Sequence, residues 1–138
     1  MFFISRRKEG TAAEYYVYHN PNPAHARVGD CAVRALSIAL GKDWESTYVE
    51  LALWGFLMAD MPSSNNVWGK YLMRYGFRRY PVDCEHDGCT VEQFCMEHMT
   101  GTYVLALGGH VVTVVNGQYM DTWDCGGEEV YYYWKKEE

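Results

Sequence analysis

Asn116-Gly117 is the feature that most restricts how this chain can fold. The dipeptide separates two strand-like runs, residues 110–115 and 118–123. Asn-Gly between such runs is the strongest short-range signal for a hairpin with a two-residue turn. A two-residue turn fixes the pairing register, because each residue of one strand then has a defined partner on the other. The C-terminal part of the chain is therefore predicted to hold an antiparallel hairpin whose side chains can be assigned to faces.

This register places His110 and Asp121 on the same face of the hairpin. Val112 faces Asp121, and side chains alternate along a strand, so His110 and Asp121 are diagonal neighbours. Diagonal positions lie about 7–8 Å apart, within reach of an imidazole–carboxylate hydrogen bond. Asp124 would point to the opposite face. A histidine oriented by a carboxylate suits a general base, since one ring nitrogen is held as donor and the other accepts a proton. The alternative is a locally bonded histidine beside a solvated Asp121.

Cys31 stands at the start of a helix predicted over residues 31–40. Val33 and Leu36 lie on one face of that helix, and Gly41 is a natural stop for it. A helix N-terminus favours a thiolate, and its free N–H groups can stabilise an oxyanion. Cys31 is thus the candidate nucleophile. The alternative is a cysteine packed as a small hydrophobe.

Helical signals precede most of the strand signals. Asp43 can cap a second helix, and Thr90 with Gln93 forms a capping-box pattern for a fourth. The order indicates an α+β fold, with N-terminal helices packed on a C-terminal antiparallel sheet. With 138 residues the chain is expected to form a single domain, 1–138. The expected elements are strands at 15–18, 103–107, 110–115, 118–123 and 130–134, and helices at 31–40, 44–58, 65–75 and from 90 onwards.

Net charge and cysteine content restrict the partners and the cellular location that the sequence predicts. The net charge of -6 disfavours nucleic acid as a partner. Residues 1–7 do not read as a secretion signal, and no run is long enough for a membrane span. Five cysteines without an export signal favour reduced thiols and a cytoplasmic location, with at least one cysteine outside any intramolecular disulfide. The cysteines are Cys31, Cys84, Cys89, Cys95 and Cys125.

A cluster of possible zinc ligands competes with this interpretation. Cys84, His86, Cys89, Cys95 and His98 fall within fifteen residues, and zinc favours such ligands. Their spacing matches no standard finger. We therefore expect no metal and no cofactor, with zinc as the alternative.

The arrangement resembles the papain-like cysteine peptidase superfamily, in residues 29–40 and 110–123. A helix-start cysteine followed by histidine and aspartate on neighbouring strands carries the resemblance. The order is shared with transglutaminase-like proteins, and residues 29–37 are similar to the cysteine loop of ovarian-tumour-type deubiquitinases. As a whole the pattern looks like small papain-like proteins of bacteria and their phages. The resemblance implies a papain-like domain with Cys31, His110 and Asp121 as its catalytic triad.

One element of the papain pattern is missing. The family carries a glutamine about six residues before the cysteine as oxyanion donor, and that position here is His25. Asn20 and Asn22 are alternatives, because a side-chain amide can donate there, and Asn22 is preferred. The expected activity is hydrolysis of a peptide or isopeptide bond, with a peptide or protein as substrate. Acyl transfer to an amine and a non-enzymatic binding protein, for example one that sequesters a host component, are the alternatives.

Overall fold

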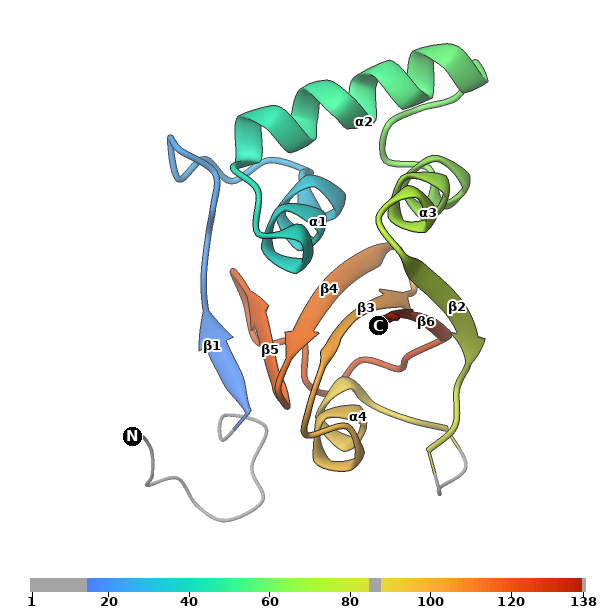
Figure 1. The fold of residues 1–138 in the computed structure, drawn as a ribbon. Coiled ribbons are helices and arrows are strands. Elements are labelled where there is room, and N and C mark those ends of the chain that lie inside the picture. The colour runs from blue at the N-terminus through green and yellow to red at the C-terminus, as the bar shows by residue number, and fades with distance from the viewer. Residues whose placement is uncertain (1–14, 85–87, 138) are drawn as a thin grey trace.

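Four helices and six strands form the described part of the chain, residues 15–84 and 88–137 of this computed structural model (Figure 1). The helices are α1 (Cys31–Leu40), α2 (Trp44–Met58), α3 (Asn65–Arg74) and α4 (Val91–Glu97). The strands are β1 (Tyr16–Tyr18), β2 (Phe77–Pro81), β3 (Thr102–Leu107), β4 (His110–Val115), β5 (Gln118–Asp121) and β6 (Tyr132–Lys136). The predicted α+β class is confirmed.

The six strands form one mixed sheet in the order β1-β5-β4-β3-β6-β2. Four of the five neighbouring pairs are antiparallel, but β1 pairs with β5 in parallel, with Tyr18 opposite Asp121. The expectation of a purely antiparallel sheet is therefore wrong at this edge. The physical reason is that β1 lies along the free side of β5, the second strand of the hairpin. This pairing joins distant parts of the chain, and no local sequence signal encodes it. Its effect is to enclose β5, the strand that carries Asp121.

The predicted hairpin register is confirmed. Val115 pairs with Gln118 and Val114 with Tyr119. Asn116 and Gly117 adopt φ angles of 49° and 80°, the left-handed conformations that such a turn demands.

Strand β5 is shorter than predicted and ends at Asp121. There the Thr122 N–H donates to the Asp121 carboxylate at 2.7 Å, an interaction that bends the chain away from the strand. The bend leaves the Asp121 side chain at the end of the sheet.

The helix boundaries follow the predicted caps. Helix α1 ends at Gly41 with a left-handed φ of 65°. Asp43 accepts a hydrogen bond from the Ser46 N–H at the start of α2. Thr90 and Gln93 make the reciprocal capping box before α4.

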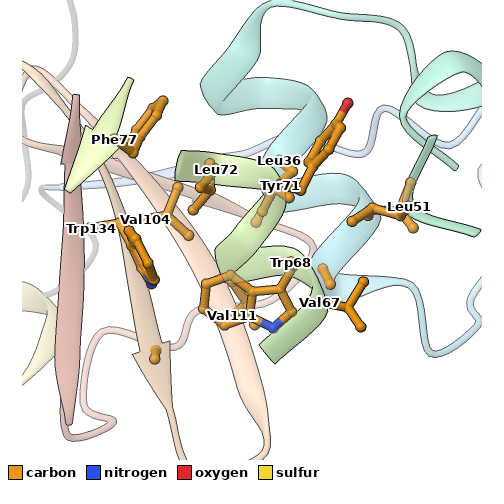
Figure 2. Packing of buried hydrophobic residues seen from close by; sticks show 14 residues of the cluster. Leu36, Leu51, Val67, Trp68, Tyr71, Leu72, Phe77, Val104, Val111 and Trp134 are labelled. Atoms are coloured by element: carbon orange, nitrogen blue, oxygen red, sulfur yellow. The ribbon is translucent and has the colours of Figure 1, made fainter. Parts of the chain in front are cut away.

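Helices α1, α2 and α3 lie on one side of the sheet and α4 lies on the other (Figure 1). Figure 2 shows the larger core, which lies between the helices and the sheet and includes Leu36, Trp68 and Trp134. Each such side chain stabilises the fold by about 1.5–3 kcal/mol when fully buried. The Thr113 hydroxyl donates to the Ala35 carbonyl and so ties α1 to β4. This contact fixes the helix that begins at Cys31 against the strand that begins at His110.

Two strands differ from expectation. The segment Phe77–Pro81 forms the edge strand β2, which sequence patterning did not predict. Its adjacent exposed Arg78 and Arg79 interrupt the apolar pattern, and Pro81 is tolerated because the strand lies at an edge. The last strand lies at Tyr132–Lys136 rather than at 130–134, because it takes its register from β3 and β2 on its two sides.

The cysteines differ in part from expectation. Cys84 and Cys89 form a disulfide, whereas all thiols were expected to be reduced. Cys31, Cys95 and Cys125 are free, which confirms that the odd number leaves a thiol outside intramolecular pairing. Residues 1–7, which bear on secretion, lie outside the described residues. Of the described helices, none has the length and apolar character needed to cross a membrane.

Candidate active site

Three element ends bring the predicted site residues together. Cys31 is the first residue of α1, His110 the first of β4 and Asp121 the last of β5. His110 Nε2 lies 2.6 Å from Asp121 Oδ2, and the His110 ring also hydrogen-bonds the Cys31 thiol. Because Asp121 engages Nε2, Nδ1 is the nitrogen left for Cys31. A thiol, an imidazole and a carboxylate are thus connected in series, the arrangement needed to activate a nucleophile.

Opposite pKa shifts favour an ion pair between Cys31 and His110. Burial alone would raise the pKa of Cys31, but the hydrogen bond and the positive charge of His110 outweigh it and lower that pKa. Burial alone would lower the pKa of His110, but its hydrogen bonds to Asp121 and Cys31 raise that pKa to about 9. Both shifts favour the thiolate–imidazolium form of the pair over the neutral thiol and imidazole. In contrast, burial raises the pKa values of the free thiols of Cys95 and Cys125, so neither is activated.

Asp121 is 2% exposed, and four donors surround its carboxylate. Oδ2 accepts from His110 and, at 3.3 Å, from the Cys125 thiol. Oδ1 accepts from the Thr122 N–H at 2.7 Å and from Arg34 Nη2 at 3.2 Å. Burial tends to raise the pKa of Asp121, but the hydrogen bonds hold it below its ordinary value. The carboxylate is therefore fixed in position and charge behind His110.

Arg34 joins this carboxylate to a second one. Its buried guanidinium contacts Asp30 through Nη1 and Asp121 through Nη2. Asp30 occupies the N-cap position of α1, yet its side chain makes no capping hydrogen bond. It accepts instead from Arg34, from Asn22 Nδ2 at 3.2 Å and from Trp44 Nε1 at 3.0 Å. The carboxylate that precedes the nucleophile is thus held by three donors.

The result is a series of alternating charges from Asp30 through Arg34 and Asp121 to His110 and Cys31. Charges removed from water cost several kcal/mol each unless they are paired and hydrogen-bonded. Removal of one of the buried members, Asp30, Arg34 or Asp121, leaves its neighbour as an uncompensated buried charge, at a cost of about 3–5 kcal/mol. The fold therefore orders the site as one connected network.

Asn22 does not lie where an oxyanion donor was expected. It is buried, its amide N–H group donates to Asp30, and its oxygen accepts from the Ala24 N–H at 2.9 Å. Of the positions considered for the oxyanion donor, Asn20 and His25 do line the cavity at Cys31. Asn22 therefore supports Asp30. Asn20, the second alternative, lines the same cavity as the candidate nucleophile.

A cavity of about 300 Å³ opens at Cys31. Trp123 and His110 border it, with their ring centroids 5.0 Å apart, and Trp123 is 44% exposed. The indole therefore packs against the imidazole at the edge of the cavity. Cys31 itself is partly exposed, so a substrate can reach its sulfur.

Asp124 is engaged elsewhere. Its carboxylate accepts from the Tyr119 hydroxyl and from the Gly126 N–H at 3.0 Å. The predicted distinction between the two aspartates is confirmed in its geometry, because Asp121 contacts His110 and Asp124 does not take that place.

Among the residues that the structure describes, the alternative zinc ligands do not converge. The sulfurs of Cys84 and Cys89 are bonded to each other, and Cys95 is buried. His98 Nδ1 lies 2.8 Å from the Phe94 carbonyl and Nε2 lies 3.1 Å from Asp83. His86 lies outside the described residues.

A different group, His110, Asp121 and Cys125, has its ligand atoms within 4.8 Å of one another. Those atoms already hydrogen-bond through Asp121, and the Arg34 guanidinium beside the carboxylate opposes a further cation.

Arg34 and Trp44 are the site residues that sequence reasoning missed. Asp30 and Arg34 are an i,i+4 pair of opposite charge, a signal that is readable in the sequence. Such pairs usually lie on a solvated helix face. Only the packing of α1 against β5 shows that this one is buried.

Comparisons of the chain with protein-family models, with curated proteins and with solved structures gave no match.

Proposed function

We propose that this protein is a cysteine hydrolase that cleaves a peptide or isopeptide bond on a papain-like fold. The observation that carries the proposal is the hydrogen-bonded series Cys31–His110–Asp121 at the mouth of a cavity. Asp121 holds Nε2 of His110, which directs Nδ1 toward the thiol and keeps the imidazolium charged.

The chemistry follows from this order. The Cys31 thiolate attacks the substrate carbonyl, and the N–H groups at the start of α1 stabilise the oxyanion. The His110 imidazolium donates its proton to the leaving amine, which departs and leaves a thioester on Cys31. Neutral His110 then takes a proton from water, the hydroxide attacks the thioester, and the Cys31–acyl bond breaks to release the acid product, which restores the Cys31 thiolate and the His110 imidazolium.

The buried network favours an enzyme over the alternative of a binding protein. A fold that only binds gains nothing from a buried Arg34 between two carboxylates, since buried ion pairs contribute little net stability. A network that orients a histidine beside an accessible cysteine does have a chemical use. Acyl transfer would proceed through the same thioester and differs only in the final nucleophile, so the products of turnover separate it from hydrolysis.

The pH dependence of Cys31 alkylation tests this proposal. The rate of reaction with iodoacetamide, followed by peptide mapping, is expected to reach half its plateau below the ordinary thiol pKa of about 8.5, because His110 lowers the pKa of Cys31. Hydrolysis needs the imidazolium as acid, so turnover is expected to decline as pH rises through the His110 pKa of about 9. An alkylation midpoint at or above the ordinary thiol value would show that Cys31 is not activated and would refute the proposal.

A further inference from the structure

The cavity at Cys31 differs in charge from the protein as a whole. The chain carries 18 acidic residues against 12 lysines and arginines. None of the described residues that line this cavity is acidic, whereas four of the lining residues are arginines or histidines. They are His25, Arg27, Arg34 and His110. A cavity with this lining in a negatively charged protein favours an anionic group on its ligand.

Arg27 is the cation in this lining that has no counter-charge within the described chain. Arg34 is neutralised by the two carboxylates it bridges, and His110 pairs with Asp121. The ion pairs among the described residues do not include Arg27, whose side chain is exposed. A guanidinium presents a planar fork of N–H donors that matches a carboxylate in two parallel hydrogen bonds.

The loop that carries Arg27 is tied to the catalytic network. His25 adopts a left-handed φ of 52°, which is uncommon for a residue with a side chain and persists only where its surroundings hold it. The His25 N–H donates to the Asn22 carbonyl at 2.9 Å, and the buried Asn22 amide is bonded to Asp30. Arg27 is thus attached to a loop anchored next to the nucleophile.

We propose that the substrate carries a carboxylate beside its scissile acyl group and that Arg27 binds that carboxylate, which makes Arg27 a specificity-determining residue. This inference rests on the proposed hydrolase function and names its substrate class as acidic peptides. The carboxylate belongs either to an acidic side chain or to the C-terminus of the peptide. Arg27 attracts both through the same bidentate contact.

Two alkylating reagents of matched size test the charge of the cavity without knowledge of the substrate. Iodoacetate and iodoacetamide each form a bond between their methylene carbon and Cys31 Sγ and release iodide, but only iodoacetate is anionic. The rate of reaction of Cys31 with iodoacetate, divided by its rate with iodoacetamide, is measured by peptide mapping. This ratio is expected to fall about three- to ten-fold in Arg27→Gln. Arg27→Lys is expected to retain much of the ratio, and added salt to reduce it in the wild-type protein.

Arg78→Gln is the matched control, because Arg78 is also exposed but lies on the edge strand β2. Equal ratios in Arg27→Gln and Arg78→Gln, with Cys31 reactive in both, would overturn the carboxylate inference and leave the proposed hydrolase standing. A Cys31 that reacts with neither reagent would overturn both.

Peptide pairs then separate the two sources of the carboxylate. One pair exchanges glutamate for glutamine on the acyl side of the scissile bond, and the other exchanges a free C-terminus for an amide. A preference of about ten-fold in kcat/KM for the charged member of either pair, lost in Arg27→Gln, identifies the source. Equal kcat/KM within both pairs would contradict the inference.

Discussion

Replacing Cys31 with alanine is expected to abolish turnover while the fold remains intact. The change removes one sulfur atom from a partly exposed position at the start of α1, where the buried stripe of the helix is untouched. Removal of a nucleophile reduces kcat on the order of a million-fold in the serine-hydrolase precedent, and a loss of that order is predicted here. Turnover of a peptide substrate measures the loss of activity, and thermal unfolding of the variant measures whether the fold is intact.

Cys95→Ala serves as the matched control. Cys95 is also free, but it is buried on α4 and its thiol has a raised pKa. This variant should lose some stability and keep its turnover per folded molecule. Full turnover in Cys31→Ala would refute the nucleophile assignment.

Exchange of Asp121 for asparagine is expected to lower kcat by up to about four orders of magnitude, as in the serine-protease precedent. Two donors, Thr122 N–H and Arg34, point at Oδ1, so the amide oxygen of the asparagine must take that place. Its NH2 group then faces His110 Nε2. His110 is forced to carry its proton on Nδ1, toward Cys31, where it cannot accept the thiol proton.

Asp124→Asn is the comparison for this variant. Asp124 accepts from Tyr119 and Gly126 and lies outside the bonded series, so most activity should remain. Both variants preserve side-chain shape, and kcat measured on folded protein ranks them. A larger loss in Asp124→Asn than in Asp121→Asn would show that the triad assignment is wrong.

Local signals in the sequence were sufficient for the elements that carry the triad. The Asn116-Gly117 turn fixed the register that brings His110 to Asp121, and the apolar stripe of residues 31–40 located the helix start at Cys31. These predictions succeeded because turn chemistry and helix periodicity depend on residues close in sequence.

Features that depend on distant contacts were not predictable in this way. The parallel pairing of β1 with β5 joins segments about a hundred residues apart. The burial of Arg34 depends on where α1 meets β5, and a single sequence does not encode that contact in any local pattern. The prediction of Asn22 as oxyanion donor fails for the same reason, because the loop turns Asn22 inward to Asp30 and leaves Asn20 and His25 at the cavity.

Acid quenching tests most directly whether Cys31 becomes acylated during turnover. p-Nitrophenyl acetate supplies an activated acyl group that needs no substrate recognition. Mixing it with the protein is expected to release a burst of about one nitrophenolate per chain, and peptide mapping after the quench should find the acetyl thioester on Cys31. Acetylation of lysines or of another cysteine, with Cys31 unmodified, would contradict the account.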